Sequence, residues 1–175
     1  MTKKEFMNRL ANDQVDVLQK FLDLLSELGM DYCVIGGLAV NAYVEPVVSL
    51  DLDLVVAAGD IEKLRKAAPP MFSVKAFAHS LNLNSSQSDL RIQIQTDPRY
   101  QGFIAHATEK KVMGYDMKVA ALEDVLQGKI WAYSDQHRRQ SKRQKDLADI
   151  FRLVEAFPHL RALLPDSRDF KAVGN

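Results

Sequence analysis

Two aspartates separated by one residue, Asp51 and Asp53, are the strongest candidates for chemistry in this chain. They interrupt an apolar run that contains Leu50, Leu52 and Leu54, so we expect them in a β-strand. Side chains alternate between the two faces of a strand, which predicts both carboxylates on one face. Two like charges held side by side repel each other and resist burial. A divalent cation would relieve that repulsion, and Mg²⁺ is commonly bound by one or two carboxylates together with substrate phosphates.

A pair of glycines, Gly36 and Gly37, lies between an apolar run at 32–35 and a run of mostly small residues at 38–43. This pattern predicts a strand, a tight turn and a short helix. Glycine lets the backbone approach an anion closely, and the N–H groups at a helix N-terminus point toward it. The turn therefore suits the phosphates of a nucleoside triphosphate. The alternative is a strand entering a turn, where exposed aspartates bind nothing, but that leaves the glycine pair unexplained.

The segment Gly36-Gly37, a short helix, then Ser49-x-Asp51-x-Asp53 and a following apolar run resembles the nucleotidyltransferase superfamily. The resemblance is to the small bacterial group around the AbiEii-type toxins and minimal nucleotidyltransferases. It implies an α/β (α+β) fold, with a mixed β-sheet flanked by helices and C-terminal helices packed on it. It further implies that the glycine pair holds the triphosphate and that the two aspartates bind Mg²⁺. We expect Ser49, on the same face, to contact a phosphate or a water of the metal.

The activity that this resemblance implies is Mg²⁺-dependent transfer of a nucleoside monophosphate from a nucleoside triphosphate to a hydroxyl of RNA or protein. It also implies a toxin–antitoxin context, in which the partner is a cognate antitoxin or toxin. The alternative is a catalytically degenerate protein of the same fold that acts as a nucleotide-binding or regulatory partner.

Two positions depart from the pattern of the family and favour that alternative. Family members usually place a further acid on a neighbouring strand, and the corresponding strand here, 89–95, carries Gln93 at that position. Glutamine cannot accept a proton as a carboxylate does. Asp89 lies on the same face but roughly 13 Å along the strand, so we expect it to be a poor substitute. Where many members carry arginine, four residues before the first aspartate, this chain has Val47.

Two C-terminal segments, 122–129 and 143–150, resemble the helices of the family that face the nucleotide. The resemblance implies that Lys129 and Lys145 neutralise the triphosphate and that Asp146 orients one of them. The alternative is an exposed helix surface with ordinary pairs along the helix. Asp149 is expected to serve packing and capping.

The run 137–145 contains five Lys and Arg side chains in nine residues. Such a run could contact RNA phosphates, which are bound mostly by Arg and Lys. It contains no aromatic residue for base stacking, and a solvated helix start is the simpler interpretation. An RNA-binding module that uses Arg138 and Arg139 is the third functional hypothesis.

The remaining elements are predicted from periodicity and from turn residues. We expect an amphipathic helix over 15–28 and another that begins at Asp60 as N-cap. We also expect irregular β-structure over 72–83, a polar turn over 82–88, a strand over 89–95, a short strand around Gly114, helices over 121–133 and 141–157, a short helical piece over 159–164, and a loosely ordered tail after Pro165.

The bulk composition excludes several classes of protein. The chain has 175 residues with 23 basic and 23 acidic side chains, so no net charge draws it to nucleic acid or membrane. Its one cysteine, Cys33, lies in an apolar run, which predicts a reduced core residue. No stretch is apolar enough to span a bilayer, and the N-terminus lacks the apolar stretch of a signal peptide. We therefore expect a cytoplasmic protein with one domain, its sheet over about 30–120 and its C-terminal helices over about 121–165.

Overall fold

The protein is built on one mixed sheet of seven strands in the order β3-β4-β5-β2-β1-β7-β6. The computed structural model describes residues 1–171. The β2–β5 and β1–β7 pairs are parallel, and the other neighbours are antiparallel. The strands are β1 (Tyr32–Ile35), β2 (Asp51–Val56), β3 (Ser73–Ala76), β4 (Ser80–Asn84), β5 (Arg91–Gln95), β6 (Thr108–Val112) and β7 (Tyr115–Val119). The predicted α/β architecture with a mixed sheet is confirmed.

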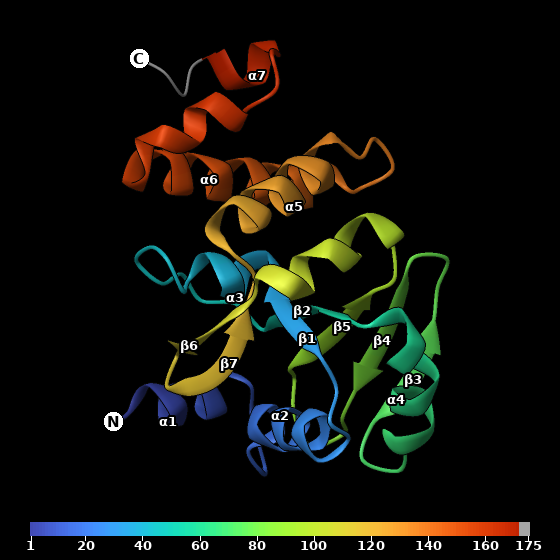
Figure 1. Cartoon of the computed structure of the whole chain (residues 1–175). Coiled ribbons are helices and arrows are strands. Elements are labelled where there is room, and N and C mark those ends of the chain that lie inside the picture. Colours follow the sequence, from blue (N-terminus) through green and yellow to red (C-terminus); the bar gives the residue numbers. More distant parts are fainter. Residues whose placement is uncertain (172–175) are drawn as a thin grey trace.

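Helices lie on both sides of this sheet in the view of Figure 1. Below it lies α2 (Val17–Glu27); at the lower right, overlapping β3 in this view, lies α4 (Ile61–Ala67); and above it lie α3 (Gly36–Val40), α5 (Leu122–Ser134) and α6 (Gln140–Ala156). The two long C-terminal helices pack against each other, and both contact α3. The shorter elements are α1 (Lys3–Leu10), η1 (Ala58–Asp60), η2 (Pro98–His106), η3 (Pro158–Leu163) and α7 (Arg168–Lys171). The one-turn helix α3 therefore connects the sheet to the C-terminal helices.

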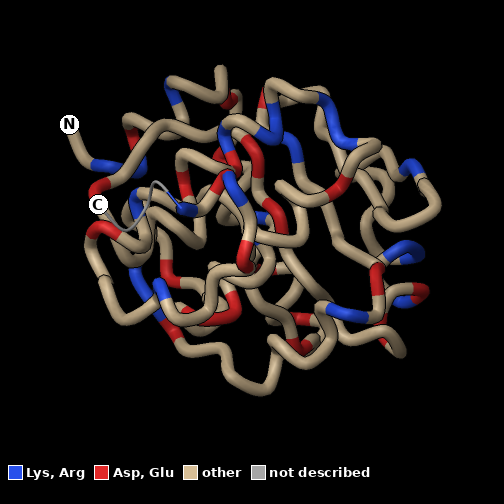
Figure 2. Tube along the Cα trace, turned by 90° about the horizontal axis from the view of Figure 1, so that it is seen from above, with Lys and Arg blue, Asp and Glu red and all other residues tan. Residues whose placement is uncertain are grey.

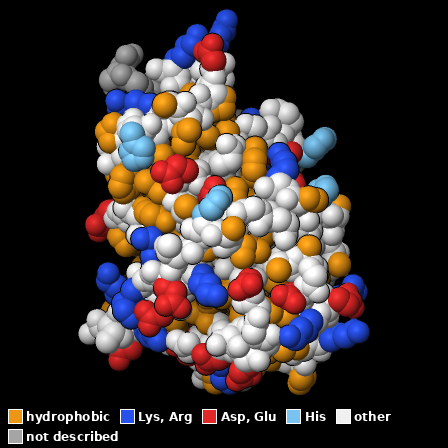
Figure 3. Space-filling model, in the orientation of Figure 1, with side chains coloured by type: hydrophobic (Ala, Val, Ile, Leu, Met, Phe, Trp, Pro, Cys, Tyr) orange, Lys and Arg blue, Asp and Glu red, His pale blue; other side chains and the backbone are white. Residues whose placement is uncertain are grey.

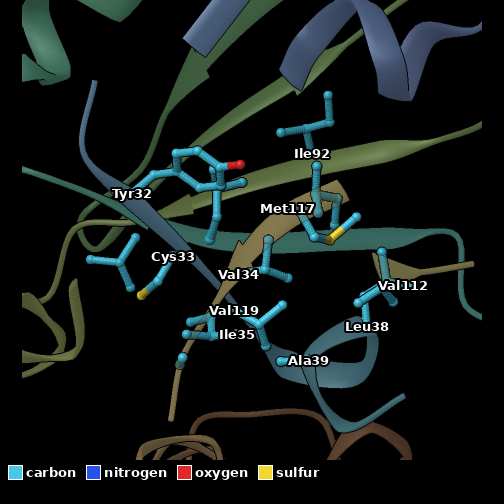
Figure 4. Packing of buried hydrophobic residues seen from close by; sticks show 14 of the residues in the cluster. Tyr32, Cys33, Val34, Ile35, Leu38, Ala39, Ile92, Val112, Met117 and Val119 are labelled. Atoms are coloured by element: carbon cyan, nitrogen blue, oxygen red, sulfur yellow. The ribbon is translucent and has the colours of Figure 1, made fainter. Parts of the chain in front are cut away.

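The hydrophobic core is centred on β1, which is buried along its whole length. Figure 4 shows Val34 and Ile35 of β1 beside Val119 of β7, with Leu38 and Ala39 of α3 below them. Burial of apolar surface at about 25 cal/mol per Å² is the main contribution that such a core makes to stability. Because α3 is anchored in this core, the glycine turn that begins it has a fixed position relative to the sheet.

The structure corrects several of the predicted boundaries. The polar segment 82–88 is not all turn, because β4 continues through Asn84. One predicted strand around Gly114 is a hairpin of two, β6 and β7. Asp60 stands at the N-cap of α4, but its side chain makes no capping hydrogen bond. The tail after Pro165 contains the short helix α7, and its last four residues lie outside the described part of the chain.

Two further elements, nearer the N-terminus and in the middle of the chain, were not predicted. The first is α1, which begins with a capping box in which Thr2 accepts a hydrogen bond from the Glu5 backbone and Glu5 accepts one from that of Thr2. The Thr-x-x-Glu pattern could have identified it. The second is η2, which starts at Pro98 after the N-cap Asp97. Its 3₁₀ hydrogen bonding gives it no clear α-helical period in the sequence.

Charged residues are spread over the molecule without separation by sign. Figure 2 shows basic and acidic segments mixed along the trace, and the face in Figure 3 carries hydrophobic side chains interspersed with charged ones. None of the helices in the described residues is long and apolar enough to cross a membrane. Any recognition of a charged ligand must therefore come from a local group of side chains.

We expect Leu54→Ala to destabilise the protein by about 2–5 kcal/mol, because it leaves a cavity in the central strand beside the core. Leu54 is fully buried, whereas the control Leu163 is 49% exposed. The control Leu163→Ala should cost less than about 1 kcal/mol. Urea denaturation of both variants measures the difference, and equal losses would contradict this description of the core.

Candidate functional site

The strand β2 carries Asp51 and Asp53 on one face and the fully buried Leu52 and Leu54 on the other. The burial pattern alternates over these four residues as expected for a strand with one packed face. Both carboxylates are partly exposed, and both line the same two pockets. The strand thus holds two acids side by side at a solvent-accessible position.

The glycine turn lies directly against Asp53. Gly36 has φ +69°, and a Cβ at this position would lie 2.5 Å from Asp53 Oδ2. A side chain would therefore be strained by the backbone and would collide with the carboxylate, so glycine is required here. A Cβ on Gly37 would come within 3.6 Å of Ser49 Oγ. The sequence-predicted residues Gly36, Gly37, Ser49, Asp51 and Asp53 are therefore neighbours in space.

The carboxylate of Asp51 has two cationic partners. Arg91 Nε of β5 donates to Oδ1 at 2.5 Å, and Lys142 Nζ of α6 donates to Oδ2 at 3.3 Å. Burial opposes ionisation of Asp51, but these two partners outweigh it and lower its pKa. Asp51 is therefore ionised, and Lys142 joins the helical layer to the sheet through it.

Asp53 has the opposite tendency. Burial raises its pKa to about 6; the positive charge of Lys129 opposes this shift, and the negative charge of Asp51 adds to it. The two acids therefore differ in pKa, because within residues 1–171 only Asp51 has ion-pair partners. A cation placed between them would favour the charged form of Asp53.

Behind the aspartates lies a buried ion cluster formed by α5, α6 and the loop between them. Lys129 Nζ lies 3.0 Å from Asp146 Oδ1 and 2.8 Å from Asp149 Oδ2. Arg138 Nε lies 2.7 Å from Asp146 Oδ2, and Arg152 Nη1 lies 2.7 Å from Asp149 Oδ1. Burial opposes the charge on Lys129, but Asp149 and Asp146 raise its pKa overall. Every charged group of the cluster has an opposite partner, and with three cations and two anions the cluster keeps one net positive charge.

This cluster shows that Lys129 and Asp146 lie beside the site, with Lys129 held by the carboxylates rather than free. Asp149, which was assigned to packing and capping, is one of its two ion-pair partners. Lys145 behaves differently: it is exposed, lines both pockets and has no ion-pair partner in the described residues. Of the two predicted lysines, Lys145 is the one available to a new anion.

The neighbouring strand β5 places Gln93 opposite Asp53 in the parallel register. Gln93 lines both pockets, so it occupies the predicted third position beside the aspartates. Asp89 does not join them. It precedes β5, accepts a hydrogen bond from Asn12 at 2.5 Å and lines neither pocket. The site therefore has an amide where a third acid was sought.

The basic run 137–145 does not form one surface. Arg138 is bound to Asp146, Lys142 to Asp51, and Arg143 donates to the carbonyl oxygen of Tyr133 at 2.7 Å. Only part of the run is left for an external phosphate. Arg138 is paired with Asp146, so of the two arginines only Arg139 has no ion-pair partner in the described residues, and the RNA-binding module stays a prediction.

Two pockets meet at Asp51 and Asp53. The glycine-side pocket has a volume of about 390 Å³ and is lined by residues that include Gly36, Gly37, Ser49, Val47, Lys129 and Arg152. The amide-side pocket has a volume of about 580 Å³ and is lined by residues that include Asn82, Asn84, Arg91, Arg139, Ser141 and Lys145. The aspartates thus lie on the wall shared by two separate spaces.

The ion-pair partners Arg91 and Lys142 were missed by sequence reasoning. Arg91 could have been found from the predicted strand, because a parallel neighbour of β2 brings alternate residues of β5 to the same face. Lys142 had no such signal, because its contact with Asp51 joins residues 91 positions apart. The helix packing that makes this contact is not encoded locally.

The metal-binding potential of the site rests on its two aspartates. Within residues 1–171 no three His, Cys, Asp or Glu side chains gather in a metal-binding group. Two carboxylates with a glycine turn beside them fit one cation that takes its other ligands from phosphates and water. They do not fit a cation held by protein side chains alone.

Comparison with known proteins shows the fold of nucleotidyltransferases. No protein-family model and no curated protein sequence matches the chain. Among solved structures, it matches ANT(2″)-Ia in complex with adenylyl-2″-tobramycin with a TM-score of 0.63 and 16% identity, over 86% of this chain and 94% of that one. It matches lincomycin-bound lincosamide antibiotic adenylyltransferase LnuA with a TM-score of 0.55 and 12% identity, over 79% of this chain and 97% of that one.

A third neighbour is a nucleotidyltransferase-like protein from Paracoccidioides brasiliensis, with a TM-score of 0.51 and 20% identity, over 90% of this chain and 83% of that one. Identities this low establish the architecture but not the substrate. The nucleotidyltransferase fold implied by the sequence resemblance is confirmed.

We expect Lys129→Met to destabilise the protein by about 3–5 kcal/mol, because it removes the cation between two buried carboxylates. The control is Lys111→Met, which removes an exposed ion pair with Asp116 at 2.8 Å and should cost at most about 1 kcal/mol. Thermal and urea unfolding measure both. A loss below 1 kcal/mol for Lys129→Met would show that the cluster adds little to stability.

Stability should also depend on pH through Asp53. Its pKa is raised to about 6 in the folded state from 3.8, so the folded protein binds the extra proton between these values. Stability should therefore fall as pH rises from about 4 to 6, by at most about 3 kcal/mol. Asp53→Asn should lose this part of the dependence. Urea midpoints of both proteins across this range test it, and parallel curves would contradict the raised pKa.

Proposed function

We propose that this chain is a Mg²⁺-dependent nucleotidyltransferase that moves a nucleoside monophosphate from a nucleoside triphosphate to an acceptor hydroxyl. The single observation that carries the proposal is the contact of the glycine turn with the paired aspartates, where a Gly36 Cβ would lie 2.5 Å from Asp53. The nucleotidyltransferase fold supports it, because the same architecture occurs in two antibiotic adenylyltransferases.

The donor nucleotide would lie in the glycine-side pocket. The backbone at Gly36 and Gly37 can approach the triphosphate closely, and Ser49 Oγ is beside them. Lys145 lines this pocket without an ion-pair partner in the part of the chain that is described, so it is free to neutralise a phosphate. Lys129 and Asp146 contribute indirectly, because their ion pair fixes the wall of the pocket.

When bound, one Mg²⁺ would supply charge neutralisation at the phosphates, held by Asp51 and Asp53. Asp51 and Asp53 would hold this cation through their ionised carboxylates. Arg91 and Lys142 both pair with Asp51 and therefore lie beside the proposed position of the phosphates. The two side chains are therefore suited to stabilise negative charge on the transferred group.

In the reaction, the acceptor oxygen forms a bond to the α-phosphorus while the bond from that phosphorus to the bridging oxygen breaks. Pyrophosphate leaves with the electron pair of the broken bond. The hydroxyl proton passes to solvent, because Gln93 cannot accept it as a carboxylate would. The contribution of the chain is to position donor and acceptor in line and to neutralise charge.

The second candidate is a degenerate relative that binds nucleotide without transferring it. Gln93 opposite Asp53 and the double ion pairing of Asp51 favour this candidate. The acceptors implied by the resemblance are RNA and protein hydroxyls, with a toxin or antitoxin as partner. The structural neighbours bind lincomycin and adenylyl-2″-tobramycin, so small-molecule acceptors belong in the same assay.

We expect label transfer from [α-³²P]NTP in the presence of MgCl₂ and total RNA, cell lysate or the two antibiotics. Asp51→Asn and Asp53→Asn should each lower the rate at least about 100-fold, because they remove the charge that holds the cation. Asp116→Asn is the matched control, since Asp116 is 77% exposed on β7 and lies outside both pockets.

The same experiment separates the two candidates. Transfer that depends on both aspartates supports the enzyme. Binding of labelled nucleotide by the wild-type protein with no transfer to any acceptor would support the degenerate relative and exclude the enzyme.

A further inference from the structure

The side chains that line the amide-side pocket carry a net positive charge, whereas the basic and acidic side chains of the whole chain are equal in number. Four basic side chains line it, namely Arg91, Arg139, Lys142 and Lys145, against two acidic ones, Asp51 and Asp53. Four minus two leaves an excess of two positive charges at a single concave site. Since the whole chain has 23 basic and 23 acidic residues, this excess is a local feature.

The excess belongs to two side chains that lack a counter-ion. Arg91 and Lys142 are bound to Asp51, whereas neither Arg139 nor Lys145 has a side-chain partner in residues 1–171. Both are exposed at the start of α6, six positions apart. Unpaired cations at the rim of a pocket favour an anionic ligand, and phosphate is an anion that both Arg and Lys bind well.

The floor of this pocket is a polar face of the sheet. Asn82 pairs with Gln93, which pairs with Asp53, so the three side chains form a row across β4, β5 and β2. Asn84 and Arg91 form the next row with Asp51 in the same way. Side-chain amides both donate and accept hydrogen bonds, as sugar hydroxyls do. Asn82 Oδ1 has no hydrogen-bond partner in the described structure, so this row keeps an acceptor that a ligand can use.

The rows also set the distance that a ligand must cover. Neighbouring strands are about 4.8 Å apart, so Asn82 lies roughly 10 Å from Asp53. One sugar phosphate can reach across this span. No aromatic side chain lines the pocket, so the ligand would be held by charge and hydrogen bonds rather than by stacking of a base.

From these observations we infer that the amide-side pocket binds a phosphate-bearing sugar as the acceptor of the reaction. Its reactive hydroxyl lies at Asp51 and Asp53, and its other hydroxyls contact Asn82 and Asn84. Its phosphate contacts Arg139 and Lys145, and because Lys145 lines both pockets it serves the phosphates of donor and acceptor together. The assignment of this ligand as the acceptor rests on the proposed function, whereas the existence of the binding site does not. This phosphate-bearing sugar is either the terminal nucleotide of an RNA or a free sugar phosphate. A protein hydroxyl lacks the phosphate that these two cations require.

The experiment measures binding without a donor nucleotide. Ribose 5-phosphate, ribose, a short single-stranded RNA and an uncharged serine peptide are titrated by calorimetry into the wild type, Arg139→Gln, Asn84→Asp and Gln144→Glu. Gln144→Glu is the matched control, because Gln144 is exposed on the same helix and lines neither pocket. Asn84→Asp is isosteric and keeps the strand intact if Arg139→Gln folds poorly. Mg²⁺-ATP binding to each variant is measured separately.

We expect ribose 5-phosphate or the RNA to bind the wild type and Gln144→Glu equally, and the other two variants about tenfold more weakly. Ribose and the peptide should bind more weakly than either phosphate ligand, and Mg²⁺-ATP binding should change less than twofold because Arg139 and Asn84 line only the amide-side pocket. Binding by the RNA alone, or by ribose 5-phosphate alone, supports the inference and identifies the source.

Three results would overturn the inference: neither ribose 5-phosphate nor the RNA binds more tightly than ribose, the peptide binds more tightly than both phosphate ligands, or Arg139→Gln, Asn84→Asp and Gln144→Glu all bind equally. The proposed function is tested independently of this outcome. If phosphate ligands bind as described but no nucleotide is ever transferred, the site is correct and the transfer reaction is wrong.

Discussion

The structure of the site depends on the repulsion between two carboxylates that one strand holds side by side. A strand cannot turn Asp51 and Asp53 away from each other, because alternate residues share a face. The protein reduces the cost differently at each position: Arg91 and Lys142 pair with Asp51, whereas Asp53 has a raised pKa. Both the ion pairs of Asp51 and the raised pKa of Asp53 can change when a ligand binds. A cation that binds both carboxylates would favour the ionised form of Asp53 and compete with Arg91 and Lys142 for Asp51, so the paired acids are suited to accept positive charge.

The buried ion cluster extends the same principle behind the site. Lys129 is held by Asp146 and Asp149, which have Arg138 and Arg152 as further partners. Buried pairs of this kind contribute little net stability, but removal of one member is costly. The role of these ion pairs here is to hold the helices in position. The cluster fixes α5 against α6, and α6 carries Lys142 and Lys145 to the aspartates.

The parts of this protein that could be predicted from sequence are those in which the signal is local. Gly36, Gly37, Asp51 and Asp53 lie within 18 residues, and strand alternation and glycine freedom decide their arrangement. The predicted turn over 82–88 began too early, because Asn82 and Asn84 alternate with the buried Leu83 in β4 and the turn lies at 86–87. Lys142 could not be predicted to contact Asp51, since that contact depends on how α6 packs on the sheet. Asp149 was misjudged for the same reason.

The shared wall between the two pockets has a thermodynamic consequence. If a ligand on the glycine side changes the charge at Asp51, it also changes the potential felt on the amide side, where Lys142 is released from its partner. The affinities of the two ligands are then linked, and by reciprocity each must alter the other by the same factor. The two sites of this small protein would therefore behave as one cooperative unit, with an order of binding set by which ligand first disturbs the ion pairs.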